Sequence, residues 1–570
     1  MIAPIAPTVT PPAAPPADPP PPADRAVSAD RAGTAERAER AERAERAERA
    51  GLADPVGDGA LLAADPAGLV RLSRLVDEVL VAARAGLRRR TGPLPAVTPA
   101  QLAAQIDADL AGGVLPRRGC GTSALLALAR RYAEATVDLS DPATAAHLQP
   151  PALTVAVAAD VIANAFNASV DTWDSGPYAV ELERHVIRAL NELVGFDGAG
   201  VLTSGGTASN LQALLLARDL AASGDPGTSD RLAASHRPGI SDRSGDRSGG
   251  RMVVLCSEIA HFSVARACGV LGLGGDAVRG VPVDGLWRMR PEALDAALTG
   301  LPPGERPIAV VATAGTTDFG SIDPLRELAA VAAEHGVRLH VDAAYGGGAL
   351  FSERLRPLLD GLDLADSVTI DLHKTAWQPA AASALLVRRA SDFGFAERVD
   401  YLNPGDDGEA GYDGLLGYSL ATTRRADALK VAATFGVLGR DGIGALLEHC
   451  CDLARHAADR IDSDPRLELV ADPALSTVVF RYRPPGHPQP TAGHPQPTAD
   501  RPRPGTDAVN GALRRRLMRT GRALVGRTTV PGVGVCLKLT LLNPQARPSD
   551  IDALLDAVAH AGSQEESHDN

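Results

Sequence analysis

The sequence is poor in aromatic residues, which make up 3% of its 570 positions, whereas Gly (57) and Pro (44) are abundant. A core with few large rings must consist of Leu, Val and Ala, or part of the chain must lie outside any core. No uninterrupted apolar run reaches the ~18–20 residues of a membrane-spanning helix. The first residues lack the charged and apolar regions of a signal peptide. We therefore expect no contact with a membrane.

Basic residues are not in excess either. The chain has 57 Lys and Arg against 70 Asp and Glu, a formal net charge of −13, whereas a nucleic-acid binder would normally present a basic face. The six cysteines show no C-x-x-C spacing, which argues against a disulfide framework and against a zinc site. We expect a cytoplasmic protein with no metal ion and no nucleic-acid partner.

Several segments are of low complexity. Residues 1–60 combine a Pro/Ala-rich start with an Ala-Glu-Arg repeat, residues 223–250 and 484–507 are polar or Pro-rich, and residues 563–570 end the chain. We expect these segments to be disordered. The repeat favours a solvated spacer over a helix for a partner, because it has no apolar stripe. His487 and His494 lie in a tandem GHPQPTA repeat, which favours a duplicated loop over a metal site.

The remaining chain divides by pattern into three parts. Residues 61–150 have helical apolar spacing, and residues 421–562 read as a smaller α+β domain. Between them, residues 151–420 alternate helices with short β-branched runs, among them MVVLC, IAVVAT, RLHVDA, SVTID and ALLVRR. This alternation predicts βαβ units and a mostly parallel sheet with helices on both faces.

A Gly-rich turn, TSGGTASN at residues 203–210, precedes the helical pattern LQALLLAR. Free N–H groups and a partial positive charge at a helix N-terminus form a natural phosphate site. The alternative is an ordinary turn whose helix is capped by Thr207 or Ser209. The segment is not a P-loop, because the GK[ST] ending is absent.

Three further residues are expected at the carboxyl edge of the sheet, where open α/β sheets bind ligands. Asp342 and Lys374 each end a predicted strand, and His261 follows one. A buried Asp needs a cationic partner, a desolvated Lys forms Schiff bases, and an imidazole stacks on rings or moves protons. Taken singly, an Asp that caps a helix, a solvated Lys and a structural His are the ordinary interpretations.

Together these features are the parts that hold pyridoxal phosphate (PLP). The lysine forms the Schiff base, the aspartate pairs with the pyridinium nitrogen, and the Gly-rich turn holds the phosphate. The combination therefore favours a PLP enzyme over the separate structural interpretations.

From about His147 to Pro544 the sequence also resembles the group II PLP-dependent decarboxylases of the glutamate and aromatic amino-acid type. The motifs TSGGTASN, His261, ATAGTTDFGSIDP, HVDAAYGG, ADSVTIDLHK, YLNP and TTRRADALK occur in the order of that family. The resemblance implies an α/β fold of the aspartate-aminotransferase type (fold type I). It also implies a homodimer with the active site at its interface. Within the family, four motifs look most like those of bacterial decarboxylases of 2,4-diaminobutyrate and of lysine, namely DTWD, DFGSIDPL, WQP and LKLTLLNP.

The resemblance assigns roles to matching positions. It implies that Lys374 is the Schiff-base lysine, Asp342 the pyridinium partner and Tyr401 the proton donor of a mobile loop. The other implied cofactor contacts are His261 and Ala344 on the two ring faces, Gly206, Thr207 and His373 at the phosphate, and Thr317 at the ring or substrate.

Two positions depart from the family pattern. Lys538 stands where relatives often carry an Arg for the substrate carboxylate, and Ser175-Gly176-Pro177 has an extra Gly. Asp171 and Asp174 are candidates for a distal substrate ammonium, with a turn or capping role as the even alternative.

We therefore expect a PLP-dependent decarboxylase that converts a basic diamino acid, 2,4-diaminobutyrate or lysine, to a diamine. The alternatives are a glutamate or aromatic decarboxylase, a PLP aminotransferase, and a catalytically silent scaffold. The presence of every reactive position argues against the scaffold.

Overall fold

The computed structural model describes residues 62–111, 113–223, 250–393, 402, 404–484 and 504–569. The chain divides into two compact units, one of residues 63–115 with 126–570 and one of residues 1–62 with 116–125. The fold and the site described below belong to the first unit. The predicted disordered tail 1–60 lies outside the described residues, as do the segments predicted at 223–250 and 484–507 except at their ends.

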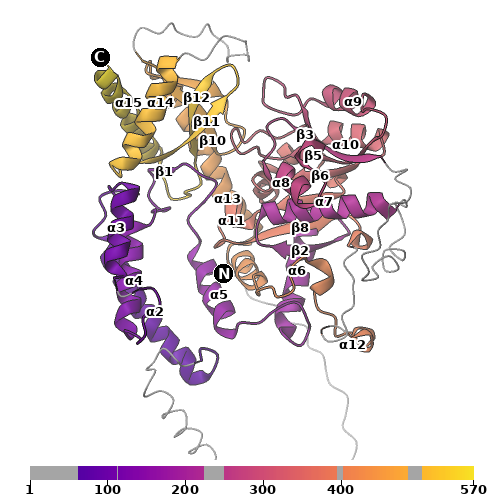
Figure 1. The fold of residues 1–570 in the computed structure, drawn as a ribbon, viewed down its shortest axis with the longest axis horizontal. Coiled ribbons are helices and arrows are strands. Elements are labelled where there is room, and N and C mark those ends of the chain that lie inside the picture. The colour runs from indigo at the N-terminus through magenta and orange to yellow at the C-terminus, as the bar shows by residue number, and fades with distance from the viewer. Residues whose placement is uncertain are drawn as a thin grey trace, which may run out of the picture. The chain divides into compact units, whose positions relative to one another are not determined.

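A seven-stranded sheet forms the centre of the chain (Figure 1). Strand β8, second from one edge, runs antiparallel to both neighbours, β2 and β7, while all other neighbouring strands are parallel. The mostly parallel sheet predicted for the α/β region is thereby confirmed. In sheet order the strands are β2 Ala199–Thr203, β8 Ser383–Val387, β7 Ser367–Ile370, β6 Arg338–Asp342, β5 Glu305–Thr313, β3 Arg251–Ser257 and β4 Val278–Val281.

Helices cover both faces of this sheet because its strands are apolar on both sides. In β3, Val254 and Cys256 pack in the cluster that includes α7 (Gly206–Ser223) and α8 (Ser263–Val270). Val253 and Leu255 point the other way, into the cluster of α6 (Pro177–Val194), α9 (Pro291–Thr299) and α10 (Leu325–Glu334). Successive side chains of a strand alternate between faces, so a continuous apolar run indicates a strand buried on both.

A second sheet of five strands lies in the C-terminal part, in the order β1-β11-β12-β10-β9. The short strand β1 (Thr144–Ala145) pairs in parallel with β11 (Leu524–Val530), so the N-terminal segment supplies one strand of this sheet. The other pairs are antiparallel. The remaining elements are β12 Gly534–Thr540, β10 Thr477–Tyr482, β9 Leu467–Ala471, and the helices α14 Pro504–Arg519 and α15 Pro548–Asp569.

One helix belongs to both cores. Helix α13 (Ala428–Asp462) changes direction at Gly439, whose φ of 64° and ψ of 178° interrupt the helical geometry. Its residues up to Cys451 pack into the core of the large sheet, whereas those from Leu453 pack into the core of the small sheet. The two cores therefore meet inside α13 and not at residue 421, the predicted boundary.

The predicted disordered tail at 563–570 is a second correction, because α15 continues to Asp569. Polar contacts hold this end of the helix, since Glu565 pairs with Arg516 and Ser563 Oγ lies 3.1 Å from the Tyr482 hydroxyl. A polar composition alone therefore does not indicate disorder here.

The other described elements are mostly short or N-terminal. They are α2 Pro66–Leu87, α3 Pro99–Asp109, α4 Thr122–Ala135, α5 Thr154–Phe166, α11 Leu372–Thr375, α12 Gly405–Glu409 and the 3₁₀ helices Gly275–Ala277, Gly346–Phe351, Arg356–Leu359, Leu362–Leu364, Ala390–Asp392 and Leu416–Tyr418. Helices α2 to α4 confirm the predicted helical N-terminal part. Within the described residues, no helix is long and apolar enough to cross a membrane.

Candidate active site

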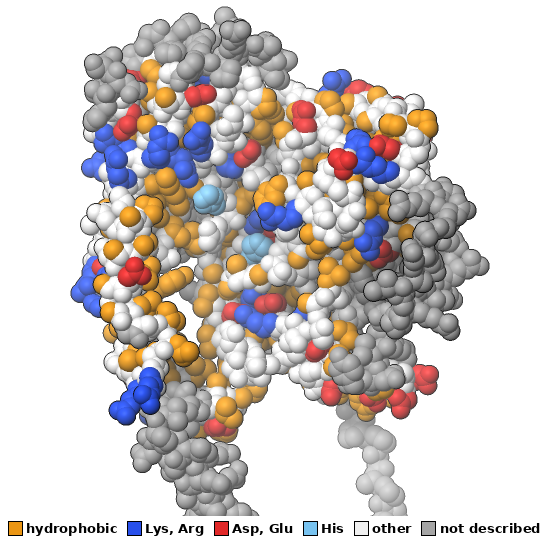
Figure 2. Space-filling model, in the orientation of Figure 1, with side chains coloured by type: hydrophobic (Ala, Val, Ile, Leu, Met, Phe, Trp, Pro, Cys, Tyr) orange, Lys and Arg blue, Asp and Glu red, His pale blue; other side chains and the backbone are white. Residues whose placement is uncertain are grey.

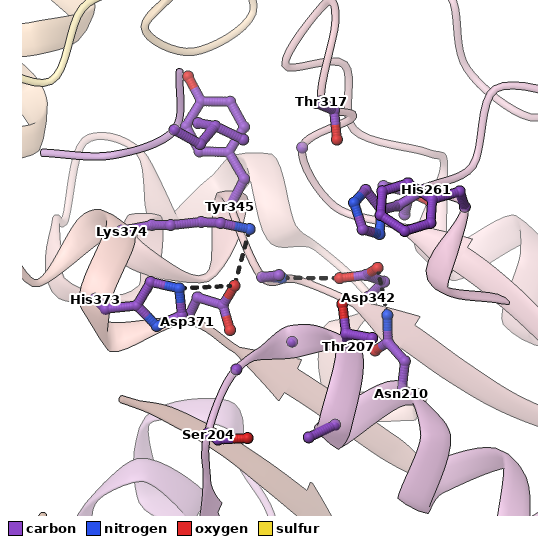
Figure 3. A pocket seen from close by; sticks show the side chains of 18 residues that line it. Ser204, Thr207, Asn210, His261, Thr317, Asp342, Tyr345, Asp371, His373 and Lys374 are labelled. Carbon is purple, nitrogen blue, oxygen red and sulfur yellow. Dashed lines mark hydrogen bonds and ion pairs between the residues drawn. The ribbon is translucent and has the colours of Figure 1, made fainter. Parts of the chain in front are cut away.

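A cavity of about 350 Å³ opens at the carboxyl edge of the large sheet. It lies between the loops that follow β2, β3, β5, β6 and β7, as expected for an open α/β sheet. Figure 3 shows the polar side chains that face this cavity. All eight cofactor residues predicted from the sequence line it, namely Gly206, Thr207, His261, Thr317, Asp342, Ala344, His373 and Lys374.

The floor of the cavity is the start of α7. The helix begins at Gly206, so Thr207 and Ser209 lie inside it and neither is its N-cap, contrary to the alternative considered from the sequence. A Cβ atom on Gly206 would lie 3.0 Å from Asp371 Oδ2 and 3.1 Å from the Ala344 Cβ. Any larger residue would have to displace one of these neighbours by a few tenths of an ångström. The first N–H groups of the helix remain available to an anion.

Asp342 is the last residue of β6, as predicted, and the residue is 5% exposed. One carboxylate oxygen accepts from the Ala344 backbone N–H at 3.1 Å, and the other accepts from Asn210 Nδ2 at 2.7 Å. Among the described residues, no cationic group lies within ion-pair distance of Asp342. A buried carboxylate of this kind fits a cationic ligand atom such as a pyridinium nitrogen.

Lys374 is placed slightly differently from the prediction. Strand β7 ends at Ile370, and Lys374 lies in the short helix α11 that follows it. Its Nζ is 2.8 Å from Asp371 Oδ2. Asp371 is 2% exposed, and its Oδ1 has no hydrogen-bond partner within the described part of the chain. The ammonium and the carboxylate face the same cavity (Figure 3).

His373 stands beside them with one nitrogen committed to the backbone. Its Nδ1 donates to the Ala382 carbonyl at 2.7 Å, which leaves Nε2 directed to the cavity side, 3.6 Å from Asp371 Oδ2. A ring fixed in this way can bind an oxyanion through Nε2 when protonated.

His261 lies on the opposite side of the cavity from Lys374 (Figure 3). Burial lowers the pKa of its imidazole, Asp342 opposes that shift, and Lys374 adds to it. Its ring is 4.2 Å from that of Phe262 at an angle of 42°. A half-buried, neutral imidazole of this kind is suited to stacking on a flat ring.

Lys538 does not line the cavity with Lys374. Its Nζ donates to the Thr317 carbonyl at 3.0 Å and lies 2.8 Å from Asp318 Oδ1. It faces a neighbouring hollow, which also holds His147, Arg514 and Arg527. Figure 2 shows Lys and Arg side chains gathered over this part of the C-terminal sheet. Positive charge is thus concentrated beside the cavity.

Neither Asp171 nor Asp174 lines the cavity. Asp171 Oδ1 accepts from the Thr172 N–H at 3.1 Å and from Ser175 Oγ at 3.3 Å, and Asp174 is exposed. Within this chain Asp171 stabilises a turn, which is the alternative left open by the sequence. Tyr401 lies outside the described residues.

Asn210 and Asp371 face the cavity, although the sequence reading gave them no role. Both belong to motifs that were recognised, TSGGTASN and SVTIDLHK. Spacing would have identified them, because Asn210 follows Gly206 by four residues on one helix and Asp371 precedes Lys374 by three.

The comparisons with known proteins bear on this site. Residues 129–483 match the family model described as "Pyridoxal-dependent decarboxylase conserved domain". The chain belongs to the pyridoxal-dependent decarboxylases.

Among its relatives, the L-2,4-diaminobutyrate decarboxylase of Rhizobium meliloti (strain 1021) is 39% identical, over 80% of this chain and 85% of the relative. The enzyme of the same name from Acinetobacter baumannii is 35% identical, over 73% and 79%. The acidic amino acid decarboxylase GADL1 of Mus musculus is 31% identical, over 71% of each chain.

A solved structure from Vibrio parahaemolyticus is similar to this decarboxylase over most of its length. It is the glutamate decarboxylase domain of diaminobutyrate-pyruvate transaminase and L-2,4-diaminobutyrate decarboxylase, and it matches with a TM-score of 0.73 and 29% identity, over 88% of this chain and 97% of that one. The expected fold type I architecture is confirmed. The protein is a PLP-dependent carboxy-lyase, and its cavity fits the cofactor through the unpaired Asp342, the constricted Gly206 and the adjacent Lys374.

Proposed function

We propose that this decarboxylase removes the α-carboxylate of a basic diamino acid, 2,4-diaminobutyrate first and lysine second, and yields a diamine. One observation supports this most. The chain is 39% identical to a diaminobutyrate decarboxylase over 80% of its length.

In this proposal each residue of the cavity contacts a different part of the cofactor. Lys374 Nζ would bind it covalently, and Asp342 would hold the proton on the pyridine nitrogen. His261 and Ala344 would contact the two ring faces. The phosphate would lie at the Gly206 and Thr207 N–H groups and His373 Nε2, and Thr317 would hydrogen-bond the ring or substrate. When bound, PLP supplies an electron sink for the electron pair left at Cα as carbon dioxide departs.

Proton movements would fall to the chain's own side chains. Asp371 lies where it can keep the ammonium of Lys374 once a substrate amine has displaced it. Tyr401 or His261 would return a proton to Cα. Lys538 already forms an ion pair with Asp318, so a substrate carboxylate would have to share the Lys538 ammonium with the Asp318 carboxylate. Asp171 and Asp174 as partners of the distal ammonium stay a prediction.

The assembly and the compartment form part of the same proposal. We propose a cytoplasmic homodimer with the active site at the interface, as the family resemblance implies. All six cysteines are free, and five of them are buried, which suits a reducing compartment.

A panel of substrates tests the proposed activity. Carbon dioxide and amine should form from diaminobutyrate, lysine or ornithine much faster than from glutamate or aromatic amino acids, and Lys374→Ala should abolish the reaction. Faster turnover of glutamate or of an aromatic amino acid would refute the diamino-acid assignment. Keto-acid formation without carbon dioxide would indicate transamination instead.

An acidic substrate is the second candidate because of one specific observation. The hollow that holds His147, Arg514, Arg527 and Lys538 adjoins the cavity through Thr317, and the GADL1 relative is named for acidic amino acids. The glutamate arm of the panel decides between the two.

The Tyr401 assignment has its own test. Tyr401→Phe should retain the cofactor but lose most amine formation, because the proton donor is gone while the cavity is intact. Amine yield equal to that of the parent enzyme would place the donor elsewhere.

A further inference from the structure

Asn210 lies between Asp342 and Ser263 on one side of the cavity. It projects from the first turns of α7 and is fully buried. Its Nδ2 lies 2.7 Å from Asp342 Oδ2 and 3.0 Å from Ser263 Oγ, so each of its two hydrogens has an acceptor. Its Oδ1 lies 3.1 Å from His340 Nε2. Figure 3 shows Asn210 beneath Asp342 and on the same side of the cavity as His261.

The direction of each hydrogen bond follows from the groups at the ends of the chain. An ionised Asp342 only accepts, so the amide nitrogen of Asn210 faces it and the amide oxygen faces His340. His340 must then donate from Nε2, and its Nδ1 accepts from the Ser367 hydroxyl at 2.9 Å. Burial lowers the pKa of His340 to about 4, which keeps this ring neutral with a single proton.

The second branch leads from Asn210 to His261. Because Ser263 Oγ accepts from Asn210, its own hydrogen is directed to His261 Nδ1, 2.8 Å away. The Ser263 backbone N–H points at the same nitrogen at 3.3 Å and can only donate. A nitrogen that accepts from two donors carries no proton. The proton of a neutral His261 therefore resides on Nε2.

We propose that Asn210 is a positioning residue that joins Asp342 to His261, and that the chain Ser367–His340–Asn210–Ser263 fixes His261 in the Nε2–H form. The histidine thus presents a donor, not an acceptor, from the nitrogen left to the cavity. The tautomer follows from the contacts alone, whereas its effect on the cofactor rests on the proposed function.

The tautomer is measured directly in the cofactor-free enzyme. The ¹⁵N shifts of the His261 ring, assigned by comparison with His261→Gln, should show a protonated Nε2 and an unprotonated Nδ1 at neutral pH. Asn210→Leu should give a mixture of both forms. The control is Gln212→Met on the same helix, because Gln212 is equally buried but its Nε2 donates to the Tyr418 carbonyl instead.

Three further variants test the proposal if Asn210→Leu does not fold. His340→Gln retains a donor toward Asn210 and should preserve the tautomer, whereas His340→Leu should mix the two forms. Ser263→Ala should do the same in part, because it removes the hydroxyl while the backbone N–H still points at Nδ1. A protonated Nδ1 in the parent enzyme, or ring shifts that no variant changes, would overturn the proposal.

Cofactor affinity supplies a second readout. Asn210→Leu and His340→Leu should weaken PLP binding by about 10- to 100-fold, the usual effect of losing a partner behind a ligand-binding group. Gln212→Met and His340→Gln should bind as the parent does, and equal affinity in all four variants would refute the link to Asp342. If no substrate of the panel is decarboxylated while the ring shifts behave as expected, the proposed function fails and the tautomer assignment stands.

Discussion

Gly206 illustrates how little space separates the cofactor cavity from its wall. An alanine there would bring its Cβ to 3.0 Å from Asp371 Oδ2 and 3.1 Å from the Ala344 Cβ. Since neither neighbour can move without disturbing the cavity, Gly206→Ala should weaken PLP binding by about tenfold or more. Fluorescence titration of the cofactor-free protein measures this. Gly436→Ala on α13, whose Cβ would meet nothing within 4 Å, is the control and should bind PLP as the parent does.

His340 makes stability depend on pH. Its folded pKa of about 4 lies below its ordinary value of 6.5. Its contribution to the unfolding free energy is therefore complete above pH 6.5 and is lost as the pH falls through 4. Over this range the imidazole binds a proton in the unfolded chain but not in the folded protein. The parent should lose about 2 kcal/mol more unfolding free energy than His340→Gln between pH 7.5 and pH 5. Parallel pH profiles for the two proteins would show that His340 does not titrate as described.

The sequence identified most of the cavity but not how its parts interact. Motifs placed Asp342, Lys374 and His261 because each lies at or just after the end of a recognisable strand. They could not show that Asn210 lies between Asp342 and Ser263. These contacts join residues far apart along the chain, and only the packing of α7 against β6 and α8 brings them together.

Among the elements, α13 is notable for its interruption at Gly439. A φ of 64° with a ψ of 178° is a conformation that side chains with a Cβ avoid. Gly439→Ala should therefore lower the unfolding free energy by about 1–3 kcal/mol. Gly436→Ala, one turn earlier and in ordinary helical geometry, should instead raise it by about 0.5–1 kcal/mol. Denaturant unfolding of both variants checks the pair, and equal effects would mean that position 439 carries no strain.

Element types were easier to predict than their directions and limits. The β-branched runs gave correct strands because a parallel sheet buries both faces of each strand. The sequence of β8 does not reveal that the strand is antiparallel, because side chains alternate between the two faces in parallel and antiparallel strands alike. The division of α13 between two cores was missed for a similar reason, because its apolar pattern continues without a break from Cys451 to Leu453.

At the scale of the whole molecule, the net charge of −13 does not describe the field at the cavity. The chain is acidic in total, yet Arg514, Arg527 and Lys538 gather beside the cavity. Burial lowers the pKa of the Arg514 guanidinium, and the neighbouring charges of Arg527 and Arg515 add to the shift. The local potential is therefore positive where the sequence total is negative.

Reversing one of these charges tests the local field. Arg527→Glu should raise kcat/KM for a diamino acid by about threefold at low salt, and the gain should vanish at high salt through screening. Arg440→Glu changes the net charge equally on an exposed stretch of α13 and is the control. An equal gain in both variants would show that total charge, and not the hollow, governs the encounter.

The pairing of β1 with β11 sets the order in which the two sheets can fold during synthesis. Thr144 leaves the ribosome about 380 residues before Leu524, the residue it pairs with. At ~5–20 residues per second, translation takes about 20–75 s to bridge that interval. During this time the large sheet can form, but the small one still lacks β11 and β12. The core of the small sheet can therefore form only when synthesis is nearly complete. In a chain that ends before β11, the strand β1 has no partner to pair with.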